Sequence, residues 1–186
     1  MPWLWNLVDI MNSLLFNIRY GKTLLTITNT ITKIYEKKSG LKIVPMRDVP
    51  AEKISSFFIA QPENSYDFFK PHGFDVKSIK RLQRLNSFLG YVFFEGEDVV
   101  AYCFIRAFFH GKGFRGRMVG VNRRGHGLGT LMNRMMNDVG FGIGLRLFET
   151  VSRRNVASYR SATSASNVKV LKEMDNDDLY LEILKD

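Results

Sequence analysis

The segment with the clearest chemical potential is rich in glycine and arginine, Arg123-Arg124-Gly125-His126-Gly127-Leu128-Gly129. An expected extended run, 118–121, precedes it, and apolar residues at helical spacing follow from Leu128 to Val139. In such a strand, turn and helix, the first helical N–H groups lack intrahelical partners, and glycine lets an anion approach the main chain. Arg117, Arg123 and Arg124 add positive charge. The segment therefore predicts a pyrophosphate site.

The same residues carry a family resemblance. Arg124 to Gly129 fits R-x-x-G-x-G and, after Val119 and Val121, resembles the acyl-coenzyme A binding segment of the GCN5-related N-acetyltransferases (GNATs). The resemblance implies acetyl-coenzyme A as the acyl donor, a small-molecule amine as the acceptor, and direct attack through a tetrahedral intermediate. It also implies that the strand at Val119 and Val121 holds the pantetheine arm. The pyrophosphate would be held by the amides of Arg124, Gly125, His126, Gly127, Leu128, Gly129 and Thr130.

A second resemblance is an asparagine at the expected start of a later helix. Asn155 stands three residues before Ser158, and in relatives this side chain contacts the coenzyme arm. From the residue alone, Asn155 is equally a helix N-cap, and the two interpretations are compatible.

The catalytic groups depart from the family pattern. Relatives often carry a tyrosine seven residues after that asparagine, where this chain has Ala162, and often carry a glutamate on the strand before the turn, where 114–121 has no acid. An amine nucleophile must lose a proton to attack, so a base is expected. The candidates are Glu149 or His110 as base and Tyr159 as acid. Their structural alternatives are an ion-pair partner, a surface turn residue and a buried aromatic.

Other interpretations of the turn stay open. It is also explained by a glycine-rich connection that binds nothing, or by a dinucleotide fold in which Glu149 binds a ribose. Against the dinucleotide fold, Thr130 occupies the third glycine position, and the preceding strands look like an antiparallel hairpin rather than a βαβ unit.

Composition predicts one globular domain of the α/β (α+β) class with an appendage, since 186 residues with 45% hydrophobic content can form a full core. The net charge of +9 favours anionic partners such as coenzyme A, nucleic acid or anionic lipid. No RNA-binding or helix-turn-helix pattern is found, so no specific nucleic acid is expected. The single Cys103 excludes an internal disulfide and, with three scattered histidines, predicts no metal site and a cytoplasmic location.

The order of expected elements matches the resemblance. A strand at 41–46 and helices at 51–59 and 76–87 precede a hairpin at 88–94 and 99–109; a third strand ends at Val121 and leads into the glycine turn and its helix. A strand at 145–151, a helix at 156–164 and strands at 168–171 and 179–184 complete the chain. We therefore expect a GNAT-like mixed, mostly antiparallel central sheet flanked by helices over residues 39–186.

Residues 1–38 are expected to form an amphipathic helical extension, interrupted or irregular after Gly21. Trp3, Trp5 and the basic residues from Arg19 to Lys38 suit an interfacial helix at a membrane, whereas folding back on the core or pairing in a homodimer explains the pattern equally. Polar residues interrupt the apolar run, so a membrane span is not expected, and the start does not resemble a signal peptide.

The acceptor is less constrained. Phe58, Tyr66 and Phe68 could stack on a sugar, and the acidic turn 175–178 could attract a cationic amine. Core aromatics and a solvated turn explain these residues equally. A resemblance to bacterial acetyltransferases of nucleotide-linked amino sugars makes an amino sugar the expected acceptor class. Two other functions remain open: a non-catalytic acyl-coenzyme A binding or membrane-associated protein of the same fold, and a basic nucleic-acid-binding module.

Overall fold

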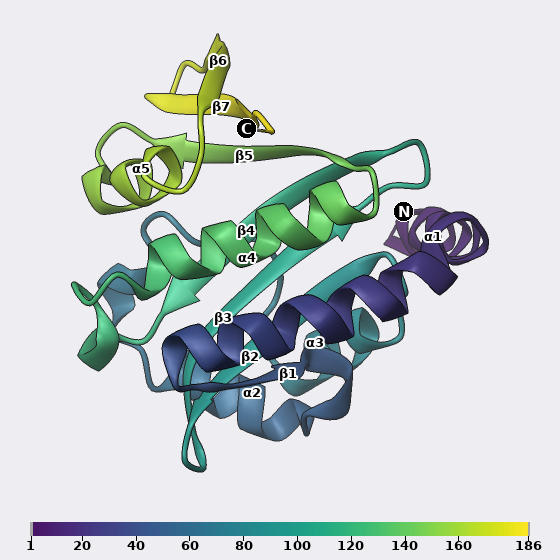
Figure 1. Cartoon of the computed structure of the whole chain (residues 1–186), viewed down its shortest axis with the longest axis horizontal. Helices are drawn as coiled ribbons and strands as arrows, with labels where there is room; N and C mark the ends of the chain where they lie inside the picture. The colour runs from purple at the N-terminus through teal and green to yellow at the C-terminus, as the bar shows by residue number, and fades with distance from the viewer. Residues whose placement is uncertain (1, 186) are drawn as a thin grey trace.

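The computed structural model describes residues 2–185. Its elements run α1 (Pro2–Ser39), β1 (Lys42–Pro45), α2 (Ala51–Ile59), α3 (Val76–Gln83), β2 (Phe88–Glu95), β3 (Asp98–Ala107), β4 (Lys112–Val119), α4 (Leu128–Gly142), β5 (Arg146–Ser152), α5 (Val156–Thr163), β6 (Val168–Glu173) and β7 (Asp178–Ile183). The strands form one sheet in the order β1-β2-β3-β4-β5-β7-β6. Every pairing among them is antiparallel except that between β4 and β5 (Figure 1).

Helices cover both faces of this sheet (Figure 1). One face packs against α1 and α4 through a core that includes Tyr20, Tyr35, Met132 and Met136. The other face packs against α2 and α3 through a second core built around Phe58 and Ile79. Because β2 and β3 are interior strands that helices cover on both faces, their sequences are apolar almost throughout instead of alternating.

The sheet opens between β4 and β5. Their parallel pairing covers only Lys112 to Phe114 against Arg146 to Phe148. Both strands continue beyond the last pair, β4 to Val119 and β5 to Ser152, and β5 then pairs on its other side with β7. The unpaired ends of β4 and β5 therefore leave main-chain groups available to something other than the sheet.

The predicted fold class and the hairpin of β2 and β3 are confirmed. Two of the expected element ends were wrong. β4 ends at Val119, because the chain turns at Gly120 and residues Val121 to Arg123 form a 3₁₀ turn. α3 ends at Gln83, four residues before the expected end. α1 is one continuous helix through Gly21 that changes direction along its length (Figure 1), so the expected extension is a single helix.

Candidate active site

The glycine turn places free main-chain donors at the start of α4. Gly125 and Gly127 adopt φ values of +82° and +77°, which side-chain-bearing residues rarely adopt, and a Cβ at either would meet no atom within 4 Å. Within residues 2–185, the N–H groups from Gly125 to Thr130 have no acceptor, and Leu131 is the first to bond back, to the Gly127 carbonyl at 3.1 Å. Six donors without a partner thus lie in sequence at the positive end of a helix.

The amide of Arg124 differs from this expectation. Its N–H donates to the Val121 carbonyl at 3.5 Å, because the 3₁₀ turn reaches this residue. Its side chain instead braces the turn: Nε donates to the Val119 carbonyl at 3.2 Å and Nη2 to Ser65 Oγ at 2.7 Å. Arg123 forms an ion pair with Glu95. The two arginines therefore hold the turn as well as carrying charge.

A cleft of about 690 Å³ opens beside the turn. Its wall comes from the unpaired end of β4, the start of α4, one side of α5 and the segment 64–69. The predicted cofactor residues in it are Val119, Arg124, Gly125, Gly127, Leu128, Gly129, Thr130, Asn155 and Ser158. His126 faces away, into a separate hollow beside Lys38 and Arg134, although its main-chain N–H belongs to the free set.

The main chain of β4 presents alternate residues to this cleft. Phe108 N–H donates to Lys112 O and Gly120 N–H to Val100 O, so even-numbered residues of β4 bond to β3 and odd-numbered residues face β5. Beyond Phe114, where pairing with β5 stops, these are Arg115, Arg117 and Val119. The expectation that Val121 belongs to this strand was wrong, and its N–H donates to Gln61 Oε1 at 3.0 Å.

Asn155 caps α5 at the cleft wall. Its Oδ1 accepts from Ser158 N–H at 3.1 Å, which satisfies one of the free donors at that helix end. Ser158 in turn accepts from Arg117 Nη2, through its carbonyl at 3.0 Å and its Oγ at 3.1 Å. Asn155 is thus a helix cap that also lines the cleft.

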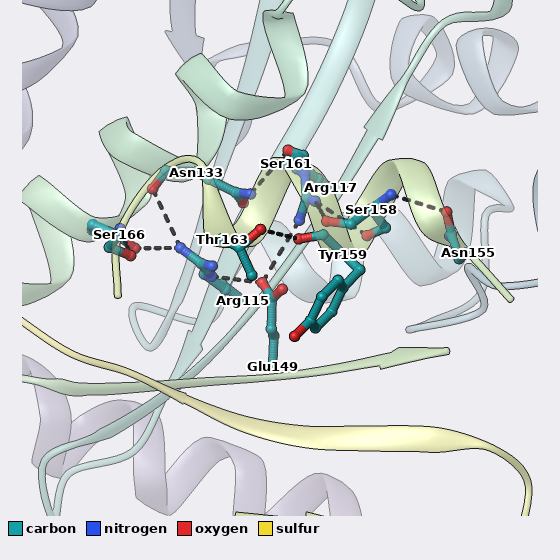
Figure 2. Close-up of polar contacts among 11 residues, drawn as sticks. Arg115, Arg117, Asn133, Glu149, Asn155, Ser158, Tyr159, Ser161, Thr163 and Ser166 are labelled. Carbon is teal, nitrogen blue, oxygen red and sulfur yellow. Dashed lines mark hydrogen bonds and ion pairs between the residues drawn. The ribbon is translucent and has the colours of Figure 1, made fainter. Parts of the chain in front are cut away.

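A buried charge cluster lies under the open sheet (Figure 2). Glu149 points from β5 toward two guanidinium groups of β4, with Oε2 at 2.7 Å from Arg115 Nε and 3.6 Å from Arg117 Nη1. The three side chains are at most 9% exposed. Burial lowers the pKa of Arg117, and the Glu149 carboxylate opposes that shift. The two arginines and one glutamate carry one net positive charge, close to the end of β4 along which the pantetheine arm of the coenzyme is expected to lie.

Two asparagines of α4 complete this cluster. Arg115 Nη1 bonds to Asn137 Oδ1, and Asn133 Nδ2 donates to Ser161 Oγ at 3.1 Å. Three buried atoms have no partner in the described chain: Arg115 Nη2, Asn133 Oδ1 and Glu149 Oε1. The sequence analysis missed Asn133 and Asn137. Their spacing of four residues, which puts both on one side of α4 next to its apolar face, was the signal that could have found them.

A second hollow of about 600 Å³ adjoins the cleft, and both include Phe68 and Phe69 in their walls. Aromatic rings from β3 and β4 form part of it, together with Arg115, Gly116 and Glu149 where the sheet opens. Charged and polar groups occupy its rim: Asp67, Lys70, Arg106, Arg154, Asn176 and Asp178. Glycine at position 116 allows the Phe104 ring to pack closely against β4, because a Cβ at this position would lie 2.6 Å from the ring.

The three predicted catalytic residues are not brought together. Glu149 lines the second hollow. Tyr159 packs against Val151, Leu179 and Leu181 and lines neither space, although its ring lies beside Glu149 in Figure 2. His110 lies in the exposed turn before β4, stacked on Phe108 at 5.5 Å, at the opposite end of that strand from the glycine turn.

Two of the expected sugar-stacking aromatics are core residues. Phe58 is fully buried, and Tyr66 donates its hydroxyl hydrogen bond to the Phe58 carbonyl. Phe68 is 45% exposed, lines both spaces and carries the Arg154 guanidinium over its ring at 5.8 Å. Cys103 is fully buried, and burial raises the pKa of its thiol well above the usual range, so it does not act as a nucleophile.

A mostly antiparallel sheet that opens at one parallel pair, with a glycine turn and free helix amides at the opening, defines the GNAT fold, and the comparisons agree. The GNAT domain of S. lividans PAT superposes with a TM-score of 0.67 at 14% identity, over 77% of this chain and 89% of that one. Campylobacter jejuni N-acetyltransferase PseH gives 0.58 at 14% identity, over 78% and 99%. AAC(6')-Ib, in complex with ribostamycin and coenzyme A, gives 0.56 at 11% identity, over 77% and 92%.

No protein-family model and no curated protein matches the sequence. The likeness therefore lies in three-dimensional structure, and at these identities it establishes that the chain has the GNAT fold.

Proposed function

We propose that this protein transfers an acetyl group from acetyl-coenzyme A to an amine of a small molecule, by direct attack. The observation that carries the proposal is the set of six unpartnered amides, Gly125 to Thr130, at the start of α4, all but one of which belong to residues that line the cleft. Main-chain donors at a helix N-terminus suit a pyrophosphate, and the neighbouring arginines add charge. PseH in complex with acetyl-coenzyme A is among the similar structures and supports the choice of donor.

The coenzyme arm would lie along the unpaired end of β4. Arg117 and Val119 present main-chain groups to this space, and Asn155 and Ser158 face it from α5. This placement brings the acyl group toward Gly116, where the cleft and the second hollow are neighbours. A main-chain N–H of β4 would donate to the thioester oxygen and to the oxyanion that forms on attack.

The second hollow would receive the acceptor. Its aromatic rings can cover the face of a sugar, and Asp67 and Asp178 can hold additional ammonium groups at the rim. We therefore propose an amino sugar as the acceptor class. An aminoglycoside acetyltransferase, AAC(6')-Ib in complex with coenzyme A and kanamycin, is among the similar structures and supports this class.

Glu149 is the candidate base in this proposal. Its Oε1 has no hydrogen-bond partner among the described residues, and its side chain borders the acceptor space. The amine nitrogen would bond to the carbonyl carbon and Glu149 would accept the amine proton, which gives a tetrahedral oxyanion. Collapse of this intermediate would break the C–S bond, and the departing thiolate would take a proton from water. His110 and Tyr159 have no role in this proposal, because they line neither space.

A transfer assay tests the proposal. Acetyl transfer should be detected with an amino sugar in a panel that also contains polyamines and peptide amines. Glu149→Gln should lose the acidic limb of the pH–rate profile, whereas Glu97→Gln, at a 98% exposed carboxylate on the β2–β3 turn, should keep it. An unchanged profile in Glu149→Gln would remove Glu149 as the base.

One observation favours a second function. Ala162 is fully buried at the position where GNATs often carry a tyrosine that acts as the general acid, and Tyr159 does not line the cleft. A protein that binds acetyl-coenzyme A without transferring the acyl group would have this arrangement. Tight binding combined with no transfer across the whole amine panel would favour it over the enzyme.

A further inference from the structure

The first part of α1 turns its polar side toward the protein. Asp9 forms an ion pair with Arg106 at 2.7 Å, and Asn6 accepts from Arg81 at 2.8 Å. Asn12 bonds to main-chain groups of Ala107 and Phe109, both at 3.0 Å, and Ser13 Oγ accepts from Asn86 N–H at 2.7 Å. Polar side chains, with Phe16 as the buried anchor, therefore attach this part of the helix to the body.

The opposite side of the same helix is apolar and exposed. Between residues 4 and 18, nine large apolar side chains other than Phe16 are 40% to 75% exposed: Leu4, Trp5, Leu7, Val8, Ile10, Met11, Leu14, Leu15 and Ile18. None of the exposed positions in this stretch carries a charge. This outward apolar face is the reverse of the usual arrangement for a surface helix. The side chain of Trp3 lies outside the described part of the chain.

The width of this outward apolar face decides what it fits. At 3.6 residues per turn, eight of the nine positions span roughly 160° of the helix circumference, from Ile10 to Val8, and Trp5 lies beyond Asn12, whose side chain bonds to the body. Pairing with a second helix needs a narrower seam, such as Leu4, Met11 and Ile18, and would leave both edges in water. A lipid surface covers the whole width of a helix lying along it.

The surrounding charges are complementary to anionic lipid. Arg19 and Lys22 follow the apolar stretch on the same helix, and Arg81 lies beside it through its bond to Asn6, whereas the charge of Arg106 is paired with Asp9. Phe109, whose N–H bonds to Asn12, adds a 42% exposed ring beside it. Within residues 2–185, no helix has the length and hydropathy to cross a bilayer. We infer that the first part of α1 lies in the interface of an anionic membrane, whatever the catalytic activity of the domain.

Flotation of the full chain with vesicles tests this inference. The protein should float with vesicles of phosphatidylcholine and phosphatidylserine, and less with phosphatidylcholine alone. The variant Met11→Gln/Leu14→Gln/Ile18→Gln should bind at least about tenfold more weakly, because three side chains lose apolar burial. The matched control Ile59→Gln/Val170→Gln/Leu171→Gln changes three exposed apolar residues elsewhere and should float like the wild type.

Thermal denaturation shows whether each variant is folded, and acetyl-coenzyme A binding, which depends on the distant glycine turn, should be unchanged in both. Equal flotation of the two triple variants would overturn the inference. A second result would also overturn it: the wild-type protein does not bind anionic vesicles and sediments as a dimer, and Met11→Gln/Leu14→Gln/Ile18→Gln sediments as a monomer. That result would assign the outward apolar face to contact with a second copy of the chain.

Discussion

Asn155 shows how one side chain can be required by the fold and still face the cleft. Its bond to Ser158 N–H caps α5, and Ser158 in turn receives Arg117 from the buried cluster. The cap, the serine and the arginine therefore fix one wall of the cleft together. A helix cap of this kind contributes about 1 kcal/mol to stability.

Asn155→Ala is expected to lower the free energy of unfolding by about 1 kcal/mol and to weaken acetyl-coenzyme A binding. The matched control is Asp75→Ala, because Asp75 caps α3 by the same bond, to Ser78 N–H at 2.9 Å, away from the cleft. Urea unfolding should show similar losses for both variants, and titration calorimetry should show weaker binding for Asn155→Ala alone. Equal affinities in the two variants would leave Asn155 with the capping role only.

His72 is a partly buried residue that the sequence analysis did not single out. Its Nδ1 lies 2.8 Å from the Gly73 carbonyl, which can only accept, so Nδ1 carries the proton and Nε2 accepts from the Tyr102 hydroxyl at 3.0 Å. Phe58, Phe74 and Phe104 surround the ring. Burial lowers the pKa of His72, and the nearby charges of Arg81 and Arg106 lower it further, against the bond to Gly73.

This pKa shift predicts a loss of stability in acid. Because the folded-state pKa lies below the unfolded value of about 6.5, the unfolded chain binds more protons in this range, and stability falls as the pH drops through 6.5. Urea unfolding at pH 7.5 and pH 5.5 should show this loss for the wild type and a smaller loss for His72→Gln. The same pH dependence in both proteins would assign the effect to other groups.

The helix α1 is part of the core as well as the carrier of the outward apolar face. Phe16 is fully buried, and the Tyr35 hydroxyl donates to Asp138 of α4 at 2.8 Å. Figure 1 shows α1 lying beside α4 over the same face of the sheet. One side of this helix thus packs into the core, whereas the other side of its first part carries the outward apolar face, although its sequence is apolar along most of its length.

Phe16→Ala should therefore lower the free energy of unfolding by about 3–5 kcal/mol, the cost of removing a buried phenylalanine. Ile18→Ala, two residues away and 75% exposed, should change it by less than about 0.5 kcal/mol. Chemical denaturation followed by tryptophan fluorescence or circular dichroism measures both. Similar losses in the two variants would contradict the assignment of inner and outer sides.

Much of the fold could be predicted from sequence, because each strand and helix carries a local signal. Apolar runs gave β2 and β3, helical spacing gave α4, and Asn155 gave the start of α5. The opening of the sheet could not be predicted in this way, since it depends on β4 and β5 pairing over only three residues. The same holds for Val121, whose conformation follows from the turn at Gly120 rather than from its own β propensity.

The candidate site could likewise be predicted only where its residues are close together in the sequence. The glycine turn is local in sequence, so its position at the start of α4 was foreseeable. The cluster of Arg115, Arg117 and Glu149 joins residues 34 positions apart, and only the parallel approach of β4 and β5 brings them together. The inward polar side of α1 was likewise hidden, because the groups that bond to it lie on α3 and on the β3–β4 turn.

On the scale of the whole molecule, the two proposals assign the net charge of +9 two anionic ligands at separate places, a pyrophosphate at α4 and a lipid surface at α1. The first proposal is the central one, because both the donor and the acceptor assignments depend on it. Gly127 and Gly96 allow a matched test, since both have positive φ (+77° and +57°) and a Cβ at either would meet no atom within 4 Å. Alanine at each position carries a similar backbone strain, of about 1 kcal/mol.

The decisive measurement is titration calorimetry of acetyl-coenzyme A with the wild type, Gly127→Ala and Gly96→Ala, each shown to be folded. The account predicts binding by the wild type and Gly96→Ala, and a loss of at least about tenfold in Gly127→Ala, whose methyl group would occupy the space where a phosphate approaches the amides. No binding by the folded wild type, or equal affinity in all three proteins, would contradict it.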